Sequence, residues 1–339
     1  MAREQDPSSL QIPTETEIRA NRERLGDLVR TTPTWAWRGP LARRLFGETE
    51  LHLKLELFQY AGSFKVRGAL TNMLGLPDEQ RQRGVTGVSA GNHAMALGYS
   101  AQVLKTRAKV VMPRNANPAR VAGCRAFGVE VILVDDVHQA FEEVHRIEKE
   151  EQMTFVHPFD GPGVALGTAT LGMELCEQVQ RLDAVIIPIG GGGLCAGVSC
   201  AIKQWNPDCR VYGVEPTGAD TMHKSFASGK IESIDKVRTI ADSLGAPHTA
   251  AYSLALCSRF VDELVLVDDD LLCAGMAALF QEGKLAVEPA GAATTAAMLG
   301  PLRDQLEGMR VGLIVCGSNI DSESFATYLV RGFNRLAKF

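Results

Sequence analysis

Residues 63–69 of this chain are Ser63-Phe64-Lys65-Val66-Arg67-Gly68-Ala69, and residues 190–193 are four consecutive glycines. A lysine that must attack an aldehyde needs apolar neighbours or a nearby cation, because its amine is otherwise protonated at neutral pH. Phe64, Val66 and Arg67 give Lys65 such neighbours. The alternative for an isolated Ser-Phe-Lys is a surface lysine beside the end of a strand.

The glycine run follows an apolar, strand-like segment at 183–189 and precedes a helix-like stretch that begins at Leu194. The backbone amides of such a turn can converge on an anion at a helix N-terminus. Glycine also serves steric purposes in tight turns and occurs in dinucleotide-binding turns, so the run alone is ambiguous. Two further segments, 89–93 and 316–319, also follow strand-like runs, and together with Lys65 they favour a held phosphorylated aldehyde.

Five ordered segments resemble the fold type II pyridoxal-phosphate enzymes, specifically the serine/threonine dehydratase and serine racemase group. The segments are Glu56-Leu-Phe-Gln59 leading into residues 63–69, Ser89-Ala-Gly-Asn-His-Ala94, the tetraglycine, Glu288-Pro-Ala-Gly291 and Cys316-Gly-Ser-Asn319. The match extends from about Thr32 to Asn319, nearly the whole chain. It implies pyridoxal 5'-phosphate as the cofactor, a small-molecule amino acid as the substrate and a homodimer.

Strand-like apolar runs alternate with helix-like stretches along the chain, which predicts an α/β fold with parallel sheets. The expected strands are 52–57, 87–89, 108–112, 130–134, 184–189, 211–214, 263–267 and 311–315, and the clearest helices are 68–75, 119–128 and 137–152. The resemblance implies two open α/β domains with mostly parallel sheets. Residues 1–76 and 164–339 would form the large cofactor-binding domain, and residues 77–163 a small domain that closes over the active site.

The composition of the 339 residues, 45% hydrophobic and 22% charged, is that of an ordinary globular enzyme with a large core. A net charge of -5 with scattered basic residues argues against a nucleic-acid partner. The sequence has no apolar run of membrane-spanning length and a polar N-terminus, so we expect a cytoplasmic protein without a membrane partner. The eight cysteines lack CxxC spacing, which indicates free thiols. Residues 1 to about 15 are expected to form a loose arm.

The resemblance assigns roles to individual residues. Lys65 would form the Schiff base with the cofactor and act as the catalytic base. Cofactor contacts would come from Phe64 on the pyridine ring, Asn92 on its 3'-oxygen, Gly190, Gly191, Gly192, Gly193 and Leu194 around the phosphate, and Cys316 at the pyridine nitrogen. The substrate carboxylate would be bound by Ser89, Asn92 and His93. Without the resemblance, these residues would be interpreted as a core phenylalanine, ordinary turns and a buried small hydrophobe.

Two positions favour elimination over racemisation. A neutral thiol at Cys316 would leave the pyridine nitrogen unprotonated and limit delocalisation of charge from Cα, which favours expulsion of a β-substituent. Racemases of the group have serine at the second position of the Ser89–His93 loop, where it acts as the second acid/base. This chain has Ala90, which cannot carry a proton.

Three departures from the family pattern concern the substrate and a metal. Ala61 and Ser243 stand where threonine and glycine are usual, which leaves the exact substrate open. Glu215 and Ala219 fit two positions of a divalent-cation site for Mg²⁺ or Ca²⁺ found in some relatives, but the third position is Thr221. Arg146 lies where one relative has an arginine for a second substrate carboxylate, although a solvated helix face is the simpler role.

The sequence therefore predicts a pyridoxal-phosphate-dependent dehydratase (ammonia-lyase) that converts an L-serine or L-threonine type β-hydroxy amino acid to a 2-oxo acid and ammonia. By family analogy the cofactor phosphate would protonate the leaving hydroxyl. The alternatives are a serine racemase, a dehydratase for 3-hydroxyaspartate or phenylserine, a β-replacement enzyme, and a nucleotide-binding regulator that uses the glycine run. The chain ends twenty residues after Asn319, so we expect no C-terminal effector domain and no feedback by isoleucine.

Overall fold

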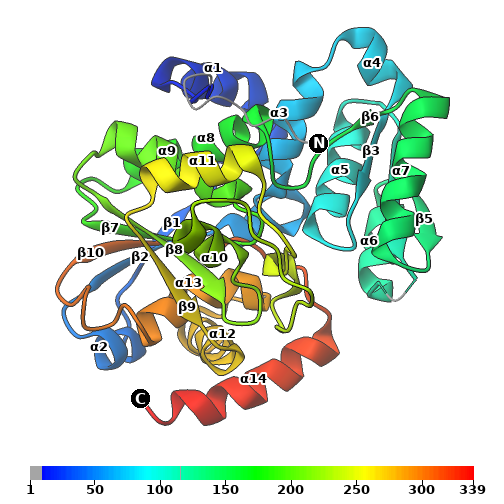
Figure 1. Cartoon of the computed structure of the whole chain (residues 1–339). Coiled ribbons are helices and arrows are strands. Elements are labelled where there is room, and N and C mark those ends of the chain that lie inside the picture. The colour runs from blue at the N-terminus through cyan, green and yellow to red at the C-terminus, as the bar shows by residue number, and fades with distance from the viewer. Residues whose placement is uncertain (1–9, 115) are drawn as a thin grey trace.

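The computed structural model describes residues 10–114 and 116–339, and its strands form two sheets (Figure 1). The six-stranded sheet has the order β1-β2-β10-β7-β8-β9, and the four-stranded sheet has the order β5-β4-β3-β6. Residues 1–9 of the expected N-terminal arm lie outside the described part. The rest of that arm is not loose: the carbonyl oxygens of Gln11 and Pro13 accept hydrogen bonds from Tyr252 and Gln204, and a helix begins at Glu15. The strands of the larger sheet are β1 (Thr34–Trp37), β2 (Glu50–Lys54), β7 (Ala184–Pro188), β8 (Arg210–Pro216), β9 (Glu263–Val267) and β10 (Arg310–Ile314). Those of the smaller sheet are β3 (Val85–Val88), β4 (Ala108–Pro113), β5 (Glu130–Val134) and β6 (Thr154–Phe155).

The sheets are parallel except for β1, which pairs antiparallel with β2. This confirms the predicted α/β fold with mostly parallel sheets. The helices before the glycine loop are α1 (Glu15–Leu25), α2 (Pro40–Phe46), α3 (Lys65–Gly75), α4 (Asp78–Arg83), α5 (Asn92–Val103), α6 (Pro118–Ala126), α7 (Val137–Glu151) and α8 (Pro162–Gln178). Those after it are α9 (Gly193–Trp205), α10 (Thr221–Ser228), α11 (Ala251–Phe260), α12 (Asp269–Gly283), α13 (Pro289–Leu299) and α14 (Ser322–Leu336). Short 3-10 turns are η2 (Gly26–Leu28), η3 (Glu56–Phe58), η4 (Tyr60–Gly62) and η5 (Asp242–Leu244).

Helices cover both faces of the larger sheet. Helices α8, α9 and α11 lie on the upper side in Figure 1, and α12, α13 and α14 lie on the lower side. Strand β7 is buried along its whole length, as expected for a central strand of a parallel sheet covered on both faces. The large core extends between these layers.

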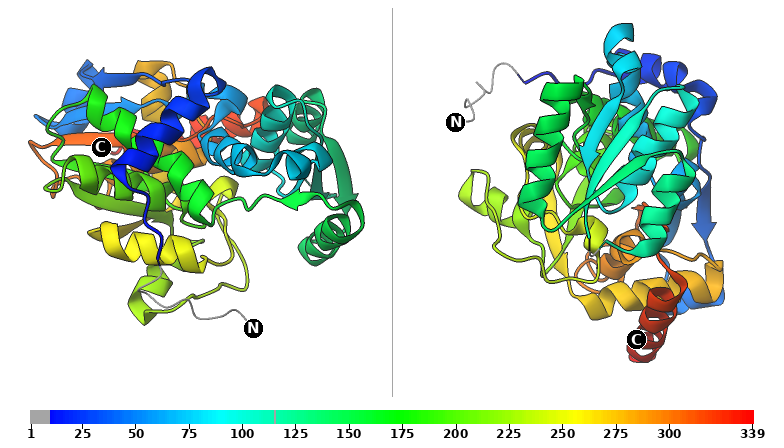
Figure 2. Two further views of the ribbon diagram at one scale, coloured as in Figure 1. Left: turned by 90° about the horizontal axis from the view of Figure 1, so that it is seen from above. Right: turned by 90° about the vertical axis from the view of Figure 1, so that its right-hand side faces the viewer.

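The smaller sheet forms a lobe of its own beside the larger unit, as the left view of Figure 2 shows. Side chains of a strand alternate between its faces, so Val110 and Met112 join the core under α5 and α6, whereas Val111 packs with the core under α7. We propose residues 77–163 as the small domain.

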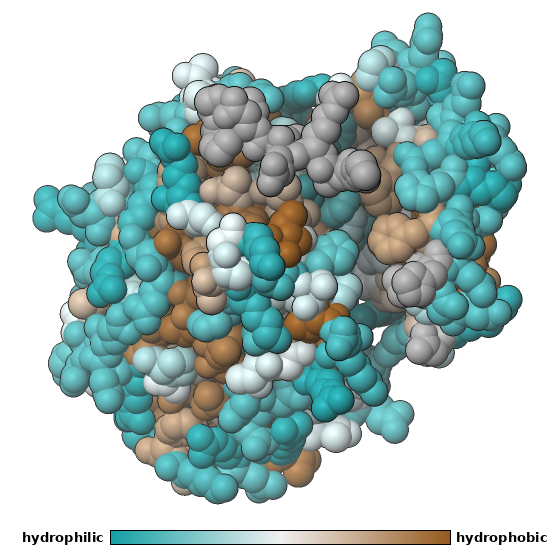
Figure 3. All heavy atoms as spheres, in the orientation of Figure 1, coloured by the Kyte–Doolittle hydropathy of each residue, from teal (hydrophilic) through white to brown (hydrophobic). Residues whose placement is uncertain are grey.

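The face of the molecule in Figure 3 is largely hydrophilic, and a hollow separates the smaller lobe from the main body. Among the described residues, no helix is both long and apolar enough to cross a bilayer.

Candidate active site

Loops that follow the carboxyl ends of parallel strands meet between the two units, as is general for open α/β sheets. A cavity of about 390 Å³ lies there, and its lining includes Ser89, Asn92 and His93, the residues predicted to bind substrate. A smaller cavity adjoins it and shares Lys65 and Asn92. The smaller cavity is lined by every residue predicted to bind the cofactor: Phe64, Lys65, Asn92, Gly190, Gly191, Gly192, Gly193, Leu194 and Cys316.

Lys65 is the first residue of helix α3, and its Nζ donates a hydrogen bond to the Pro158 carbonyl at 2.6 Å. Loss of solvent lowers the pKa of Lys65 to about 8, against smaller opposing effects of Cys316 and Glu288. The amine is therefore more often neutral than an ordinary lysine at the same pH. This is the state that attacks an aldehyde.

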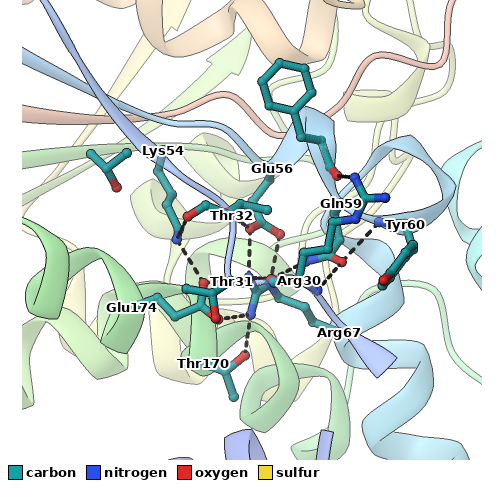
Figure 4. Close-up of polar contacts among 12 residues, drawn as sticks. Arg30, Thr31, Thr32, Lys54, Glu56, Gln59, Tyr60, Arg67, Thr170 and Glu174 are labelled. Carbon is teal, nitrogen blue, oxygen red and sulfur yellow. Dashed lines mark hydrogen bonds and ion pairs between the residues drawn. The ribbon is translucent and has the colours of Figure 1, made fainter. Parts of the chain in front are cut away.

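Arg67 does not contribute to this shift, contrary to the expectation from the sequence. Its guanidinium is buried and bound by two carboxylates, Glu56 and Glu174, each at 2.8 Å from Nη2 (Figure 4). The paired charge has little effect beyond this cluster. Burial alone therefore accounts for the lowered pKa of Lys65.

The glycine loop connects strand β7 to helix α9. Gly192 has a φ of 103°, in the left-handed region, and a Cβ on Gly191 would lie 2.2 Å from the Phe159 ring. The first amides of α9 have no acceptor inside the helix, and no acceptor is present for the amides of Gly190 to Gly192 among the described residues. Such amides suit a phosphate.

Cys316 follows strand β10 and lies beside the lysine segment. The Phe64 amide donates to the Cys316 carbonyl at 3.1 Å, and Ser63 forms a bridge with Gly317. Burial raises the pKa of the Cys316 thiol well above its ordinary value, so the side chain is neutral at pH 7. An amine, an anion cradle and a neutral thiol thus line one cavity, and this set fits pyridoxal phosphate.

Asn92 is held in a buried hydrogen-bond network. Its Nδ2 donates to Glu288 Oε1 at 2.6 Å and to Ser243 Oγ at 3.3 Å, and its Oδ1 accepts from Asn319 Nδ2 at 2.6 Å. Ser243, at the position where glycine is usual, donates to Glu288 Oε2 at 3.0 Å. Burial raises the pKa of Glu288 to about 7. The Glu-Pro-Ala-Gly segment therefore supplies a carboxylate that orients Asn92, a contact that the sequence did not predict.

The Ser89–His93 loop follows strand β3 and begins helix α5. His93 Nε2 is 2.9 Å from the Val156 carbonyl, so Nε2 carries the proton and donates it. Burial lowers the pKa of His93 to about 3, which keeps the ring neutral. Ser89 Oγ accepts from the Gly91 amide at 3.1 Å, and the Ala90 methyl group lines the larger cavity.

The larger cavity has an aromatic wall that the sequence did not predict. Phe155, His157, Phe159 and His248 follow one another edge to face, with ring-centroid distances of 5.9, 4.7 and 6.0 Å. Phe141 on helix α7 also lines the cavity, and 42% of its surface is exposed. The sequence feature that could have indicated this wall is the cluster of aromatic residues at 155–159, just before Gly161-Pro162.

Arg120 connects the two units at the rim of this cavity. Its guanidinium binds Asp242 of the larger unit through two nitrogens, at 2.5 and 3.1 Å, and donates to the Asn319 carbonyl at 3.1 Å. Arg146 is elsewhere, on an exposed face of α7, where it pairs with Glu143 and Glu150. The simpler interpretation of Arg146 as a solvated helix residue agrees with these contacts.

The predicted cation ligand Glu215 is buried and accepts hydrogen bonds from the Met222 and His223 amides, at 2.9 and 2.7 Å. Ala219 lies in the turn before them, and the neighbouring Asp220 pairs with Lys224 at 2.9 Å. Within the described ranges, no group of three or more His, Cys, Asp or Glu side chains could hold a metal ion. The cation stays a prediction without support from this arrangement.

Comparison with known proteins gives a consistent result. The family model "Pyridoxal-phosphate dependent enzyme" matches residues 27–317. The chain is 52% identical to phenylserine dehydratase of Ralstonia pickettii, over 95% of this chain and 98% of that protein. It is 37% identical to L-threonine ammonia-lyase of Thermotoga maritima, over 80% and 68%. The structure of maize serine racemase superposes with a TM-score of 0.88 at 33% identity, covering 96% of this chain and 99% of the other.

Proposed function

This chain belongs to the pyridoxal-phosphate dependent enzyme family and is a hydroxy amino acid dehydratase, and from that premise we propose that its substrate carries an aromatic β-substituent, as phenylserine does. The products would be the aryl 2-oxo acid and ammonia. The observation that carries this proposal is the aromatic wall of the 390 Å³ cavity.

An aryl group would be held by this wall through edge-to-face contacts. Phe141, Phe155, His157 and Phe159 line the cavity beside Lys65, so a ring on the substrate Cβ would lie among aromatic neighbours. Aromatic pairs add about 0.5–1.5 kcal/mol beyond the burial of their surface. The hydroxymethyl group of serine or the hydroxyethyl group of threonine would leave most of the wall without a partner.

The charges around the cavity argue against 3-hydroxyaspartate. A second substrate carboxylate needs a free cation, and the cationic side chains in the described lining are Lys65 and Arg120. Lys65 would be occupied by the cofactor. Arg120 is already bound by Asp242. On the α7 side the cavity is lined by the exposed Phe141, an apolar side chain that offers no hydrogen bond to a carboxylate.

The residues of the chain would have the following roles in the reaction. Pyridoxal phosphate, when bound at Lys65, supplies an electron sink for the bonds at Cα. Lys65 would take the Cα proton, and the loop from Ser89 to His93 would bind the substrate carboxylate. The neutral Cys316 would leave the pyridine nitrogen unprotonated, which favours elimination.

A substrate panel tests this proposal. The holoenzyme is offered both diastereomers of L-phenylserine, L-threonine, L-serine and L-threo-3-hydroxyaspartate, and 2-oxo acid release is followed. We expect the largest kcat/KM with a phenylserine isomer. A larger kcat/KM for threonine or serine would contradict the proposal.

A matched pair of variants tests the role of the wall. Phe141→Ala should raise KM for phenylserine about three- to tenfold, because an aromatic contact is lost, and leave KM for threonine nearly unchanged. Phe333→Ala removes a partly exposed phenylalanine on α14 that does not line the cavity, and it should change neither. Equal effects of Phe141→Ala on both substrates would show that the wall does not select the aryl group. The homodimer and the cytoplasmic location stay predictions.

A further inference from the structure

Elimination of water needs a group that holds the β-hydroxyl as its bond to Cβ breaks. His157 lies in the cavity wall next to Pro158, whose carbonyl accepts the hydrogen bond from Lys65 Nζ. The lysine and the histidine are therefore fixed by the same short segment. This places a second polar side chain beside the catalytic amine.

The backbone fixes the tautomer of His157. Nδ1 accepts hydrogen bonds from the amides of Phe159 and Asp160, at 3.2 and 2.9 Å. An amide can only donate, so Nδ1 is unprotonated and the neutral ring carries its hydrogen on Nε2. Burial lowers the pKa of His157, with Lys65 and His248 acting in the same direction against Asp160. Within residues 10–114 and 116–339, no protein group accepts a hydrogen bond from Nε2.

Most other polar side chains that line the larger cavity already donate hydrogen bonds within the protein. His93 donates Nε2–H to Val156, and His248 donates Nδ1–H to the Thr249 carbonyl at 3.1 Å. Ser243 donates to Glu288, and Arg120 is bound by Asp242. Ser89 retains a hydroxyl hydrogen, but it stands on the loop that we propose for the substrate carboxylate.

The imidazole is also held rigidly. Its plane is nearly perpendicular to Phe155, at 85°, and to Phe159, at 87°. These contacts, together with the two amide bonds to Nδ1, fix the direction of the Nε2–H bond. A donor whose direction is preset loses little entropy when it binds a ligand.

We propose that His157 is a further catalytic residue, which donates its Nε2–H to the β-hydroxyl of the substrate and stabilises the oxygen as it departs. This inference rests on the dehydratase activity, and the aryl group is not needed for it. The Cα–H and Cβ–O bonds break, and the Cα electron pair forms the Cα–Cβ double bond. The Cα proton passes to Lys65 Nζ, and the oxygen leaves with its bonding pair. In this proposal it takes its proton from the Lys65 ammonium to form water, in place of the cofactor phosphate that family analogy suggests. His157 keeps its own proton and acts as a neutral donor.

Two substitutions at position 157 separate loss of the Nε2–H donor from loss of the Nδ1 acceptor that holds the turn. Asn at position 157 can still accept the two amides through Oδ1, as asparagine does in turns, but it has no N–H at the place of Nε2. Gln can place an N–H near Nε2 but does not reproduce the Nδ1 acceptor. We expect His157→Asn to lower kcat for the β-hydroxy amino acid about tenfold or more, and His157→Gln to recover part of that loss. The melting temperature should follow the opposite order, with His157→Asn closer to the wild type.

The order of the two kcat values decides the proposal. If His157→Asn is as active as the wild type, or more active than His157→Gln, the residue acts through its turn and the proposal is wrong. His145→Asn, on the exposed face of α7, is the control and should leave kcat unchanged. The assay uses whichever β-hydroxy amino acid of the panel is turned over fastest, so a result against aryl substrates leaves this test intact. A ¹⁵N NMR spectrum of the protein labelled in its histidines gives an independent readout, in which His157 should show a protonated Nε2 and an unprotonated Nδ1 at pH 7.

Discussion

Arg67 Nη2 lies 2.8 Å from Glu174 Oε2, and both side chains are buried. This ion pair joins helix α3, which begins at Lys65, to helix α8 (Figure 4). Glu174 also accepts from Lys54 Nζ at 2.8 Å, and Glu56 binds Arg67 from the other side. The start of α3, and with it Lys65, the residue that we propose as the catalytic base, is thus fixed by a buried charge cluster.

We predict that Glu174→Gln is strongly destabilising. Removal of one carboxylate leaves Arg67 and Lys54 buried with incomplete compensation, which typically costs about 3–5 kcal/mol in the free energy of unfolding. Glu177→Gln on the same helix removes an exposed pair with Arg19 and should cost less than about 1 kcal/mol. Urea denaturation of the two variants measures both values. Similar losses in the two variants would contradict the role assigned to the cluster.

A second prediction concerns the pH dependence of cofactor attachment. Only the neutral amine attacks an aldehyde, and the pKa of Lys65 in the protein without cofactor is lowered to about 8. The rate of covalent attachment of pyridoxal phosphate should therefore rise with pH below 8 and level off above it. Stopped-flow absorbance between pH 6 and 10 measures this rate, and Nα-acetyllysine under the same conditions corrects for titration of the cofactor itself. A rate that still rises steeply above pH 9 would show an ordinary lysine.

The third prediction is a pH-dependent stability that originates at Glu288. Burial raises its pKa in the folded protein to about 7, above the 4.5 of a free carboxyl. The folded state then binds more protons than the unfolded state between these values, so this residue lowers stability as the pH rises from about 4.5 to about 7. A pKa shift of this size can lower the free energy of unfolding by at most about 3 kcal/mol. Urea unfolding of Glu288→Gln across this range should give a flatter profile than the wild type, and parallel profiles would refute the assignment.

The sequence predicted those parts of the structure that are encoded locally. Strands 130–134 and 263–267 match the observed β5 and β9 residue for residue, because each is a compact apolar run between polar segments. Helix α3 was expected to begin at Gly68, whereas it begins at Lys65. Gly68 and Gly167 lie where α3 and α8 approach closely, since a Cβ on Gly167 would lie 2.5 Å from the Arg67 carbonyl.

Long-range contacts could not be predicted in the same way. Strand β1 pairs antiparallel with β2 through residues 34–37, and no local pattern indicates that pairing. The sequence alone suggests that Arg67 acts as a cation on Lys65, because one of its two carboxylate partners, Glu174, is 107 positions away. The residues expected to bind the cofactor do line one cavity, because Asn92, the glycine run and Cys316 come after strands β3, β7 and β10, and Lys65 begins helix α3 beside them. Their roles toward the cofactor stay predictions. The aromatic wall has no recognisable motif, because its residues come from α7, from β6 and the segment that follows it, and from the loop around His248.

The last prediction concerns Ala90, which lines the larger cavity. The family resemblance places the serine of racemases at this position. If this alanine is what prevents racemisation, Ala90→Ser should introduce a hydroxyl that returns a proton to Cα from a side other than that of Lys65. The rate of L to D interconversion relative to 2-oxo acid release should then rise about tenfold. General acid/base groups commonly contribute about a hundredfold, but a new hydroxyl is not positioned for this reaction. A neutral Cys316 at the pyridine nitrogen, as we propose, would also still favour elimination. Chiral chromatography of the remaining amino acid measures racemisation, and uptake of deuterium at Cα from D₂O measures reprotonation there.

Ala90→Gly is the control, because it removes the methyl group without adding a proton donor. It therefore separates the effect of added space from the effect of a new proton donor. An equal rise in Ala90→Gly, or racemisation by the wild type as fast as its elimination, would mean that another group on the cavity wall already serves as the second acid/base.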